Sequence, residues 1–403
     1  MKIHQRRSRV WWIAGVAVAL ILVGIFVSAL WASYAPKQIN TATQQEAPKP
    51  KPVSVSANTL FFGNVYWGRY INDWSMKSEL KTAYPFSRLN EFDRSKYDAW
   101  IAGLECPTVA GFTQTSLEED TTLSFNCSPD YLPEAAKWFT AFTLANNHTD
   151  NRGAEGFAET RQRLDANSIQ HFGHYDPYLV EDACEVLALP VKVTYDDTSV
   201  ASEHLPVALC AYHGVFKIPP PDAIAEIAKY SQYMPVIAMP HMGKEYVATP
   251  DEIKTTTYRA LIDSGADVVL GDHPHWVQTT EAYKGKLIVY SMGNFMFDQQ
   301  DSQEVTRSAA INVVMKTTNA DSSELEEWLT LGKTCATFKD DCLATAASLQ
   351  FKELPISYQY GVVGTDDGGK IAKPATEPQQ KAILQRLNWQ ATMSQLQPPH
   401  SSL

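Results

Sequence analysis

The sequence predicts an α/β protein built as a layered sandwich. From about residue 55 onward, apolar runs of strand length alternate with segments of helical periodicity. Two apolar runs, 279–283 and 286–292, flank Lys284-Gly285, a dipeptide typical of a tight hairpin. Because hairpins join antiparallel strands, this combination favours a layered sandwich over an all-parallel sheet.

The expected elements can be placed along the chain. Thr249-Pro250-Asp251-Glu252 is typical of a capping box and predicts a helix that runs to about residue 264. Thr376-Glu377-Pro378-Gln379 predicts a last helix in the same way, whereas residues 320–370 are polar and expected to be irregular. The remaining expected elements are strands at 59–63, 98–104, 185–193 and 205–211 and a helix at 155–167.

Three apolar runs lead directly into histidine-containing stretches. These stretches are 144–150 (Leu-Ala-Asn-Asn-His-Thr-Asp), 236–243 (Val-Ile-Ala-Met-Pro-His-Met-Gly) and 271–275 (Gly-Asp-His-Pro-His). Since α/β proteins place their sites at the carboxyl ends of strands, we expect these imidazoles to meet there. Imidazole nitrogens with amide and carboxylate oxygens suit a divalent metal ion. The alternative is that they are ordinary loop histidines that cap strands.

The charge balance argues against a nucleic-acid partner. The chain has 403 residues, of which 34 are basic and 45 acidic. The first ten residues hold Lys2, Arg6, Arg7 and Arg9 and no acid, which leaves 30 basic residues against 45 acidic ones. Nucleic-acid binders need a basic face, so DNA and RNA are not expected as partners. A local basic pocket for an anionic group remains possible.

An N-terminal segment predicts export. Residues 11–32 form one uncharged apolar run, long enough to cross a bilayer as a helix, and the arginines before it place the N-terminus in the cytoplasm. The alternative is a signal peptide cleaved at Ser33-Tyr34-Ala35. Either way, the globular part is expected outside the cytoplasmic membrane. The expected organisation is a cytoplasmic basic N-terminus at 1–10, a transmembrane anchor at 11–33, an extended linker at 34–57, a globular domain at 58–316 and a C-terminal extension packing on it at 317–403.

The cysteines agree with an oxidising compartment. All six lie beyond the apolar run, and no two have the C-x-x-C spacing of a zinc ligand pair. Six cysteines allow 15 pairings. We expect sequential pairing, with Cys335–Cys342 the best supported because a short polar loop separates the two.

The order of the polar motifs resembles the CapA-type family of capsule and poly-γ-glutamate biosynthesis proteins, also called PgsA. The resemblance covers about residues 55–315 and implies a calcineurin-like metallophosphatase fold, an αββα sandwich. The motifs that carry it are Gly63-Asn64-Val65-Tyr66-Trp67-Gly68-Arg69, Gly103-Leu104-Glu105, Asn146-Asn147-His148-Thr149-Asp150, His241-Met242-Gly243-Lys244-Glu245, His273-Pro274-His275 and Ser291-Met292-Gly293-Asn294.

The resemblance implies roles for individual residues. His148 would protonate the leaving group, and Asp150 two residues on is a candidate to orient it. Arg69, with its planar guanidinium, is a candidate to hold an anionic group. Glu245 and Asn294 are candidate substrate contacts. The implied cofactor is one or two divalent ions, Mn, Fe, Zn or Mg, held by Asn64, Glu105, Asn147, His241, His273 and His275.

Three departures from the family pattern favour one metal ion over two. Asn64 stands where the family has aspartate, and a neutral amide is a weaker ligand. Tyr66 stands where metallophosphatases carry a histidine, and Gly103 stands where the family often has asparagine. The other histidines, among them His213, show no pairing pattern and are expected to be surface or structural residues.

Three functions are compatible with these residues. The first is a membrane-anchored, metal-dependent hydrolase that acts on a cell-envelope polymer or its phosphorylated precursor. The second is a non-catalytic factor that helps to assemble or export an anionic capsule polymer together with capsule synthase subunits. The third is a generic α/β ectodomain with incidental histidines. Asn64 favours the second function, and the retained histidines favour the first.

Overall fold

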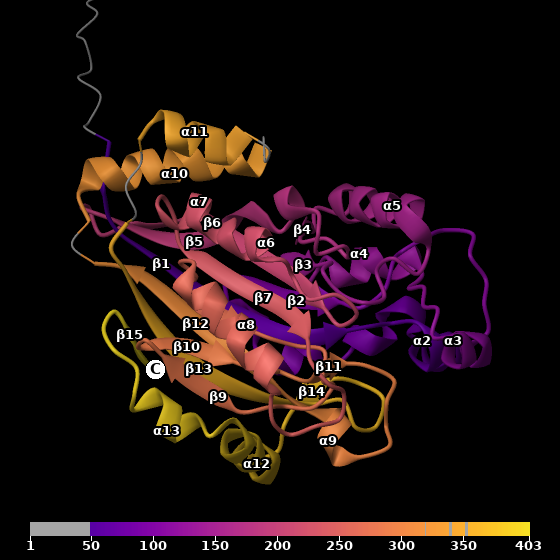
Figure 1. Cartoon of the computed structure of the whole chain (residues 1–403). Coiled ribbons are helices and arrows are strands. Elements are labelled where there is room, and N and C mark those ends of the chain that lie inside the picture. The colour runs from indigo at the N-terminus through magenta and orange to yellow at the C-terminus, as the bar shows by residue number, and fades with distance from the viewer. Residues whose placement is uncertain (1–48, 319, 338–340, 351–353) are drawn as a thin grey trace, which may run out of the picture. The chain divides into compact units, whose positions relative to one another are not determined.

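The computed structural model in Figure 1 describes residues 49–318, 320–337, 341–350 and 354–403. The expected transmembrane anchor at 11–33 and most of the expected linker lie outside the described residues. Among the residues described, no helix is both long enough and apolar enough to cross a membrane. From Pro50 onward the chain forms one compact unit.

The structure is a mixed α/β fold, as expected. Its strands are β1 (Pro52–Val65), β2 (Ala99–Leu104), β3 (Ala141–Thr143), β4 (Gln170–Phe172), β5 (Cys184–Tyr195), β6 (Val200–Gly214), β7 (Val236–Met242), β8 (Val268–Leu270), β9 (Thr280–Tyr283), β10 (Lys286–Val289), β11 (Asn294–Met296), β12 (Arg307–Thr317), β13 (Ile356–Asp366), β14 (Lys373–Pro374) and β15 (His400–Ser402). Its α-helices are α2 (Arg69–Lys77), α3 (Ser116–Thr122), α4 (Leu132–Ala135), α5 (Gly153–Ala166), α6 (Pro221–Ala225), α7 (Ile227–Ser231), α8 (Glu252–Asp263), α9 (Gln303–Thr306), α10 (Ser322–Thr337), α11 (Cys342–Ser348), α12 (Glu377–Leu387) and α13 (Trp389–Met393).

The long strand β1 is the branch point of one large sheet. Its first half pairs antiparallel with β5 and β12, and its second half pairs parallel with β2 and β11. One arm continues from β5 through β6, β7, β8 and β10 to β9, and another continues from β2 through β3 to β4. Because β1–β2–β3–β4 and β6–β7–β8 are parallel, their carboxyl ends carry the loops that follow each strand.

Alternate side chains of β1 and β2 enter two different apolar clusters. Leu60 and Trp100 belong to one buried cluster, and Phe61 and Ile101 belong to the other. A strand with period-two burial on both faces must be covered on both sides. The sheet is therefore an inner layer, and Figure 1 shows helices such as α5 and α8 beside its strands.

The C-terminal region is more regular than expected. Residues 320–370 were expected to be irregular, which is wrong, because they contain α10, α11 and β13. The apolar side chains of α10 recur at helical spacing among polar residues, and Leu325, Trp328 and Leu329 are buried. Strand β13 pairs along the whole of β12, so the extension at 317–403 continues the same sheet. Strand β1 likewise begins at Pro52, inside the expected linker.

Of the two predicted capping boxes, the one at Thr376 is confirmed and the one at Thr249 is wrong. Helix α12 has the expected capping box at Thr376. Helix α8 is capped by Asp251, whose carboxylate accepts a hydrogen bond from the Lys254 amide, so the box expected at Thr249 is wrong. A carboxylate next to the first turn outcompetes a hydroxyl two residues earlier. The Lys284-Gly285 hairpin is confirmed between β9 and β10.

The three expected disulfides are confirmed. Cys106 pairs with Cys127, Cys184 with Cys210, and Cys335 with Cys342. The second bond joins directly opposed residues of the antiparallel strands β5 and β6. No cysteine of the chain is left free, since all six lie in the described parts.

Candidate metal centre

Four buried side chains from four strand ends converge on one point. Glu105 follows β2, Asn147 follows β3, His241 lies in β7 and His273 follows β8. The Nε2 atom of His241 lies 2.8 Å from the Asn147 Oδ1 atom and 3.1 Å from the His273 Nδ1 atom. One ligand atom each from Glu105, His241 and His273 lie within 4.8 Å of one another. We call these four residues the first cluster.

The chemistry of the first cluster fits a divalent cation. Nδ1 of His241 lies 2.7 Å from the carboxylate of Asp272, and a carboxylate that accepts a hydrogen bond there favours the tautomer with the proton on Nδ1. The Nε2 lone pair then faces the Asn147 amide oxygen. Two hydrogen-bond acceptors in contact repel each other, and a cation bound to both would relieve that repulsion. Both carboxylate oxygens of Glu105 are buried without a hydrogen-bond partner among the described residues. Nitrogen and oxygen donors of this kind suit Mn, Fe or Zn.

Burial sets the electrostatics of the first cluster. Burial, with a further contribution from Asp272, raises the pKa of Glu105 well above its usual value. Burial also lowers the pKa of His241 and of His273, which favours the neutral imidazole that binds metal. The pKa of Asp272 is raised by burial to about 7, and the buried ammonium group of Lys254 opposes that rise.

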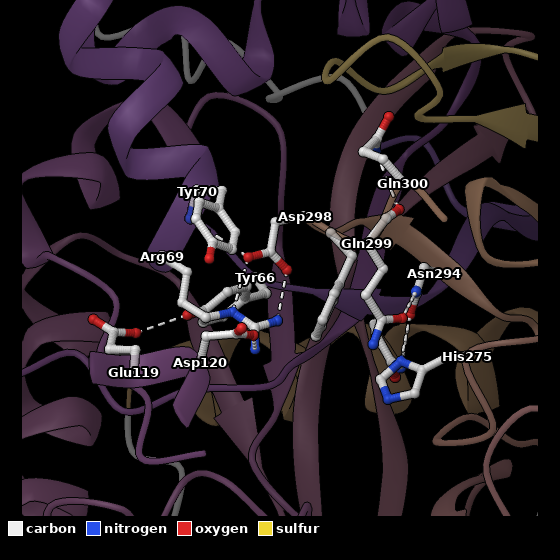
Figure 2. A network of polar contacts seen from close by, with 12 residues as sticks. Tyr66, Arg69, Tyr70, Glu119, Asp120, His275, Asn294, Asp298, Gln299 and Gln300 are labelled. Carbon is white, nitrogen blue, oxygen red and sulfur yellow. Dashed lines mark hydrogen bonds and ion pairs between the residues drawn. The ribbon is translucent and has the colours of Figure 1, made fainter. Parts of the chain in front are cut away.

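Asn64 and His275 lie together in a second cluster. The Nδ1 atom of His275 lies 2.8 Å from the Asn294 Oδ1 atom and 3.2 Å from the Asn64 Nδ2 atom. Asn64 also donates to the Asn294 oxygen at 3.1 Å. Figure 2 shows the His275–Asn294 contact beside Gln299, which accepts a hydrogen bond from Asn294. Glu245 reaches this cluster from the surface, with its carboxylate 3.9 Å from the His275 Nε2 atom. The predicted ligand set is thus divided between two clusters.

The turn between β8 and the second cluster explains this division. His273 and His275 both have positive φ values, of 88° and 60°, on either side of Pro274. A non-glycine residue at positive φ is strained, and the surrounding structure must hold it in that conformation. This backbone sends His273 to the first cluster and His275 to the second. Gly271 before it has no room for a side chain, because a Cβ atom would lie 2.3 Å from the Tyr258 hydroxyl.

His148 has an orienting partner that differs from the expected one. Its Nδ1 atom lies 3.0 Å from the Asn151 amide oxygen. Asp150, the expected partner, is exposed, and its carboxylate accepts a long hydrogen bond from the Asn151 side-chain amide. Residues 148–151 form a turn in which the Asn151 amide donates to the His148 carbonyl at 3.0 Å, so the side chain of Asn151, and not that of Asp150, lies against the imidazole. Burial lowers the pKa of His148 to about 4.

Arg69 does not present its guanidinium to a ligand. Figure 2 shows it between Asp298 and Asp120. Its Nε and a terminal nitrogen bind the two Asp298 oxygens at 2.8 and 2.6 Å, and the other terminal nitrogen lies 3.2 Å from Asp120. A buried carboxylate thus occupies the planar fork of Arg69, and the expected anion-binding role of this residue stays a prediction.

Two further residues lie near the first cluster, of which one was not predicted and the other was expected to be structural. Asp272, which orients His241, stands directly before His273, so its adjacency to a ligand was the available signal. His213 was expected to be a surface or structural residue. It is buried opposite His241 on the neighbouring strand, and its Nδ1 atom lies 2.6 Å from the Tyr175 carbonyl. Only the register of β6 against β7 reveals that position.

The model of the bacterial capsule synthesis protein family PGA_cap matches residues 58–299, which include both clusters. The chain belongs to this capsule synthesis family. The capsule biosynthesis protein CapA of Bacillus anthracis is 24% identical over 298 residues, covering 70% of this chain and 68% of that relative. The PGA biosynthesis protein CapA of Bacillus subtilis (strain 168) is 26% identical over 297 residues, covering 70% and 72%.

A solved structure from another bacterium also matches this capsule synthesis protein. It is described as the crystal structure of TT1561 of Thermus thermophilus, and it is 8% identical in sequence. The match covers 63% of this chain and 93% of that one, with a TM-score of 0.32. A score this low carries no argument about the fold. The capsule synthesis assignment therefore rests on the match to the family model.

Proposed function

We propose that this capsule synthesis protein is a metal-dependent hydrolase of phosphoesters in a cell-envelope polymer or its precursor. The observation that carries the proposal is the first cluster, in which buried acceptor atoms of Glu105, Asn147, His241 and His273 face one another. Such a set is costly to bury unless a cation is bound. The layered sheet and the strand-end position of the site support the metallophosphatase form of the αββα sandwich.

The first cluster would hold one divalent ion. When bound, that ion supplies Lewis acidity toward a phosphoryl oxygen. Asp272 would hold His241 in the tautomer that exposes Nε2. The second cluster is less suited to a second ion, because Asn294 and Asn64 already contact Nδ1 of His275 and neither brings charge.

His148 would act as the acid for the leaving group. With Nδ1 facing the Asn151 oxygen, Nε2 is left for proton transfer. A bound anionic phosphoester would favour the protonated imidazole and offset the effect of burial. Glu245 and Asn294, at the edge of the second cluster, are proposed substrate contacts. The family name supports a capsule polymer as the ultimate product, and capsule synthase subunits are proposed partners.

The second cluster favours one competing function. An assembly or export factor would keep the fold with an incomplete site, and Asn64 beside His275 is such a departure. The two functions differ in whether substrate is turned over. Metal analysis combined with a turnover assay therefore separates them.

The test uses the full chain with His273→Ala and, as a matched control, His204→Gln on the distal part of β6. We expect the wild type and the control to carry about one Mn, Fe or Zn per chain and to hydrolyse p-nitrophenyl phosphate. His273→Ala is expected to lose most of both, because it removes one ligand of four. His148→Ala should keep the metal and lose activity by about 100-fold or more. Metal without turnover would favour the assembly factor, and a wild type that binds no metal would end the hydrolase proposal.

We also propose that the domain lies outside the cytoplasmic membrane, tethered by the apolar run at 11–32. Pairing of all six cysteines supports an oxidising compartment. Protease added to intact spheroplasts should release a soluble fragment that begins within residues 34–51. Protection of the domain until the membrane is lysed would contradict this location.

A further inference from the structure

A disulfide closes a 20-residue segment directly beside Glu105. Cys106 follows the first-cluster carboxylate and is bonded to Cys127, so residues 107–126 form a loop anchored at the site. Helix α3 lies in this loop. The Cys127 amide also donates to the Pro107 carbonyl at 2.9 Å, and the Trp67 amide donates to the Cys127 sulfur at 3.4 Å. The end of the loop is therefore held against the strand ends by covalent and polar contacts.

Phe125, near the end of this loop, lies against His148. The two rings are stacked, with centroids 4.0 Å apart and planes inclined by 25°. The Phe125 amide donates to the Asn151 oxygen at 2.8 Å, and the same oxygen contacts His148 Nδ1 at 3.0 Å. Phe125 is only 3% exposed. One backbone group and one ring of the loop thus fix both the plane and the tautomer of the imidazole.

The Phe125 ring also carries a cation–π contact. The guanidinium carbon of Arg69 lies 4.5 Å from the centroid of the Phe125 ring, and Arg69 is held by Asp298 and by Asp120 of the loop. Tyr66 donates to Glu119 of the loop at 2.8 Å (Figure 2). A buried cation over an aromatic face stabilises the ring in place. Phe125 therefore contacts both the Arg69 guanidinium and the His148 ring.

We propose that the disulfide-closed segment Cys106–Cys127 positions His148 through Phe125. Phe125 is a positioning residue, since it is assigned no contact with reacting atoms. The role of the Arg69–Asp298 ion pair is then to hold the Phe125 ring in place through the cation–π contact. The proposal rests on the proposed hydrolase function only for its expected effect on turnover. The placement of the His148 ring can be measured without a substrate.

Loss of the clamp, by which we mean Phe125 and the disulfide-closed segment Cys106–Cys127 that carries it, should lower turnover and leave metal binding intact. His148 would keep Asn151 but gain freedom to rotate, and a displacement of about 1 Å at a catalytic group can cost about 100-fold. The first cluster shares no side chain with the clamp. We therefore expect kcat to fall by about 10- to 100-fold while KM and metal content stay unchanged.

The experiment compares four forms of the full chain, purified in detergent and labelled with nitrogen-15 at histidine. They are the wild type, Phe125→Leu, the conservative Phe125→Tyr, and the double variant Cys106→Ala with Cys127→Ala. The matched control is Cys335→Ala with Cys342→Ala, which removes a disulfide between α10 and α11. The His148 signals are identified by their loss in His148→Gln.

The first measurement is the NMR spectrum of the His148 ring. Stacking under Phe125 shifts its ring protons upfield, and the Asn151 contact keeps the proton on Nδ1. Because leucine has no ring current, the reporter in Phe125→Leu is the pair of His148 ring nitrogen shifts, which we expect to change from one dominant tautomer to a mixture. The Cys106–Cys127 variant, which keeps the Phe125 ring, should lose the upfield proton shift, and Phe125→Tyr and the control should keep both signatures. Unchanged His148 nitrogen shifts in Phe125→Leu would overturn the proposal, even if the cysteine variant fails to fold.

The second measurement is the kinetics of manganese-loaded protein with p-nitrophenyl phosphate. A fall in kcat alone in Phe125→Leu, with recovery in Phe125→Tyr, supports the positioning role. A change in KM or in metal content with kcat retained would overturn it. If the wild type has no turnover, the proposed hydrolase function fails, and the NMR measurement still decides whether Phe125 positions His148.

Discussion

At the scale of single residues, Asn64 makes the two clusters different. Its Oδ1 atom is buried without a hydrogen-bond partner among the described residues, and its Nδ2 atom donates to Asn294 at 3.1 Å. A carboxylate at the same position would bring the charge that a second cation needs. The amide instead links β1 to β11 by a hydrogen bond. Compared with an aspartate at this position, Asn64 therefore lacks a charged ligand group and makes an internal hydrogen bond.

Asn64→Asp should reverse that exchange. Without metal, the carboxylate would face the Asn294 oxygen and lose the donated hydrogen bond, so the free energy of unfolding should fall by about 1–3 kcal/mol. With excess Mn²⁺, the same variant should bind a second ion and recover stability by mass action. Urea unfolding with and without Mn²⁺, together with metal content per chain, checks both effects.

The control for this variant is Asn72→Asp. Asn72 uses its oxygen to accept a hydrogen bond from Tyr131, and aspartate preserves that acceptor. Asn72→Asp should therefore change the free energy of unfolding by no more than about 0.5 kcal/mol. The metal content per chain should stay the same. If Asn64→Asp binds no more metal than the wild type, restoring the charge is not sufficient, and the second cluster cannot bind an ion.

At the scale of elements, the site depends on how closely β1 passes the turn before β11. A Cβ atom at Gly63 would lie 1.9 Å from the Gly293 carbonyl oxygen, and that oxygen accepts a hydrogen bond from the Asn64 amide at 3.1 Å. Only glycine allows the two backbones to approach this closely. The approach places Asn294 within reach of both Asn64 and His275.

Gly63→Ala should push these two segments apart. We expect a loss of at least about 1–3 kcal/mol in the free energy of unfolding, because the added methyl meets backbone and not a movable side chain. Gly361→Ala in β13 is the control, since its methyl would lie 3.0 Å from the end of the Leu403 side chain, which can move aside. Chemical denaturation of both variants measures the difference. Equal losses would show that the approach of β1 to Gly293 imposes no special constraint.

At the scale of the whole molecule, the last strand, β15, adds to the part of the sheet formed by β12, β13 and β14. Strand β15 pairs parallel with β13. The Nδ1 atom of His400 lies 2.7 Å from the Tyr360 hydroxyl, and its ring stacks on Tyr358. Burial lowers the pKa of His400 from 6.5 to about 4. The folded state therefore holds this imidazole neutral.

This pKa shift predicts a pH dependence of stability. As pH falls below 6.5, the unfolded chain takes up a proton at His400 before the folded chain does, so the free energy of unfolding falls down to about pH 4. His400→Gln keeps a polar contact for Tyr360 but cannot titrate. Its loss of stability across that range should be smaller than the wild-type loss by about 1–3 kcal/mol. Denaturation in chelator at several pH values checks this, and parallel curves would contradict it.

Short-range signals in the sequence were sufficient for much of the architecture. The hairpin at Lys284-Gly285 and the cap at Thr376 depend on a few neighbouring residues, so the pattern predicted them. The strand-end position of Glu105, Asn147 and His241 also followed from the apolar runs before them. Helix α10 was not predicted although its apolar residues recur at helical spacing, because its many polar residues made the segment resemble a loop; in the structure it packs on β5 and β6.

By itself, the sequence determined the α/β class and the strand-end position of the histidine stretches, because both depend on local pattern and spacing. The ligand set followed from the family resemblance, and sequential pairing of the cysteines was one of 15 pairings that the sequence allows. The tertiary structure alone decided which side chains meet. His273 and His275 are two residues apart yet enter different clusters, because the backbone between them turns through positive φ. Arg69 is occupied by Asp298, which is 229 residues distant. Such partnerships depend on strand pairing between remote segments, and no local pattern encodes that.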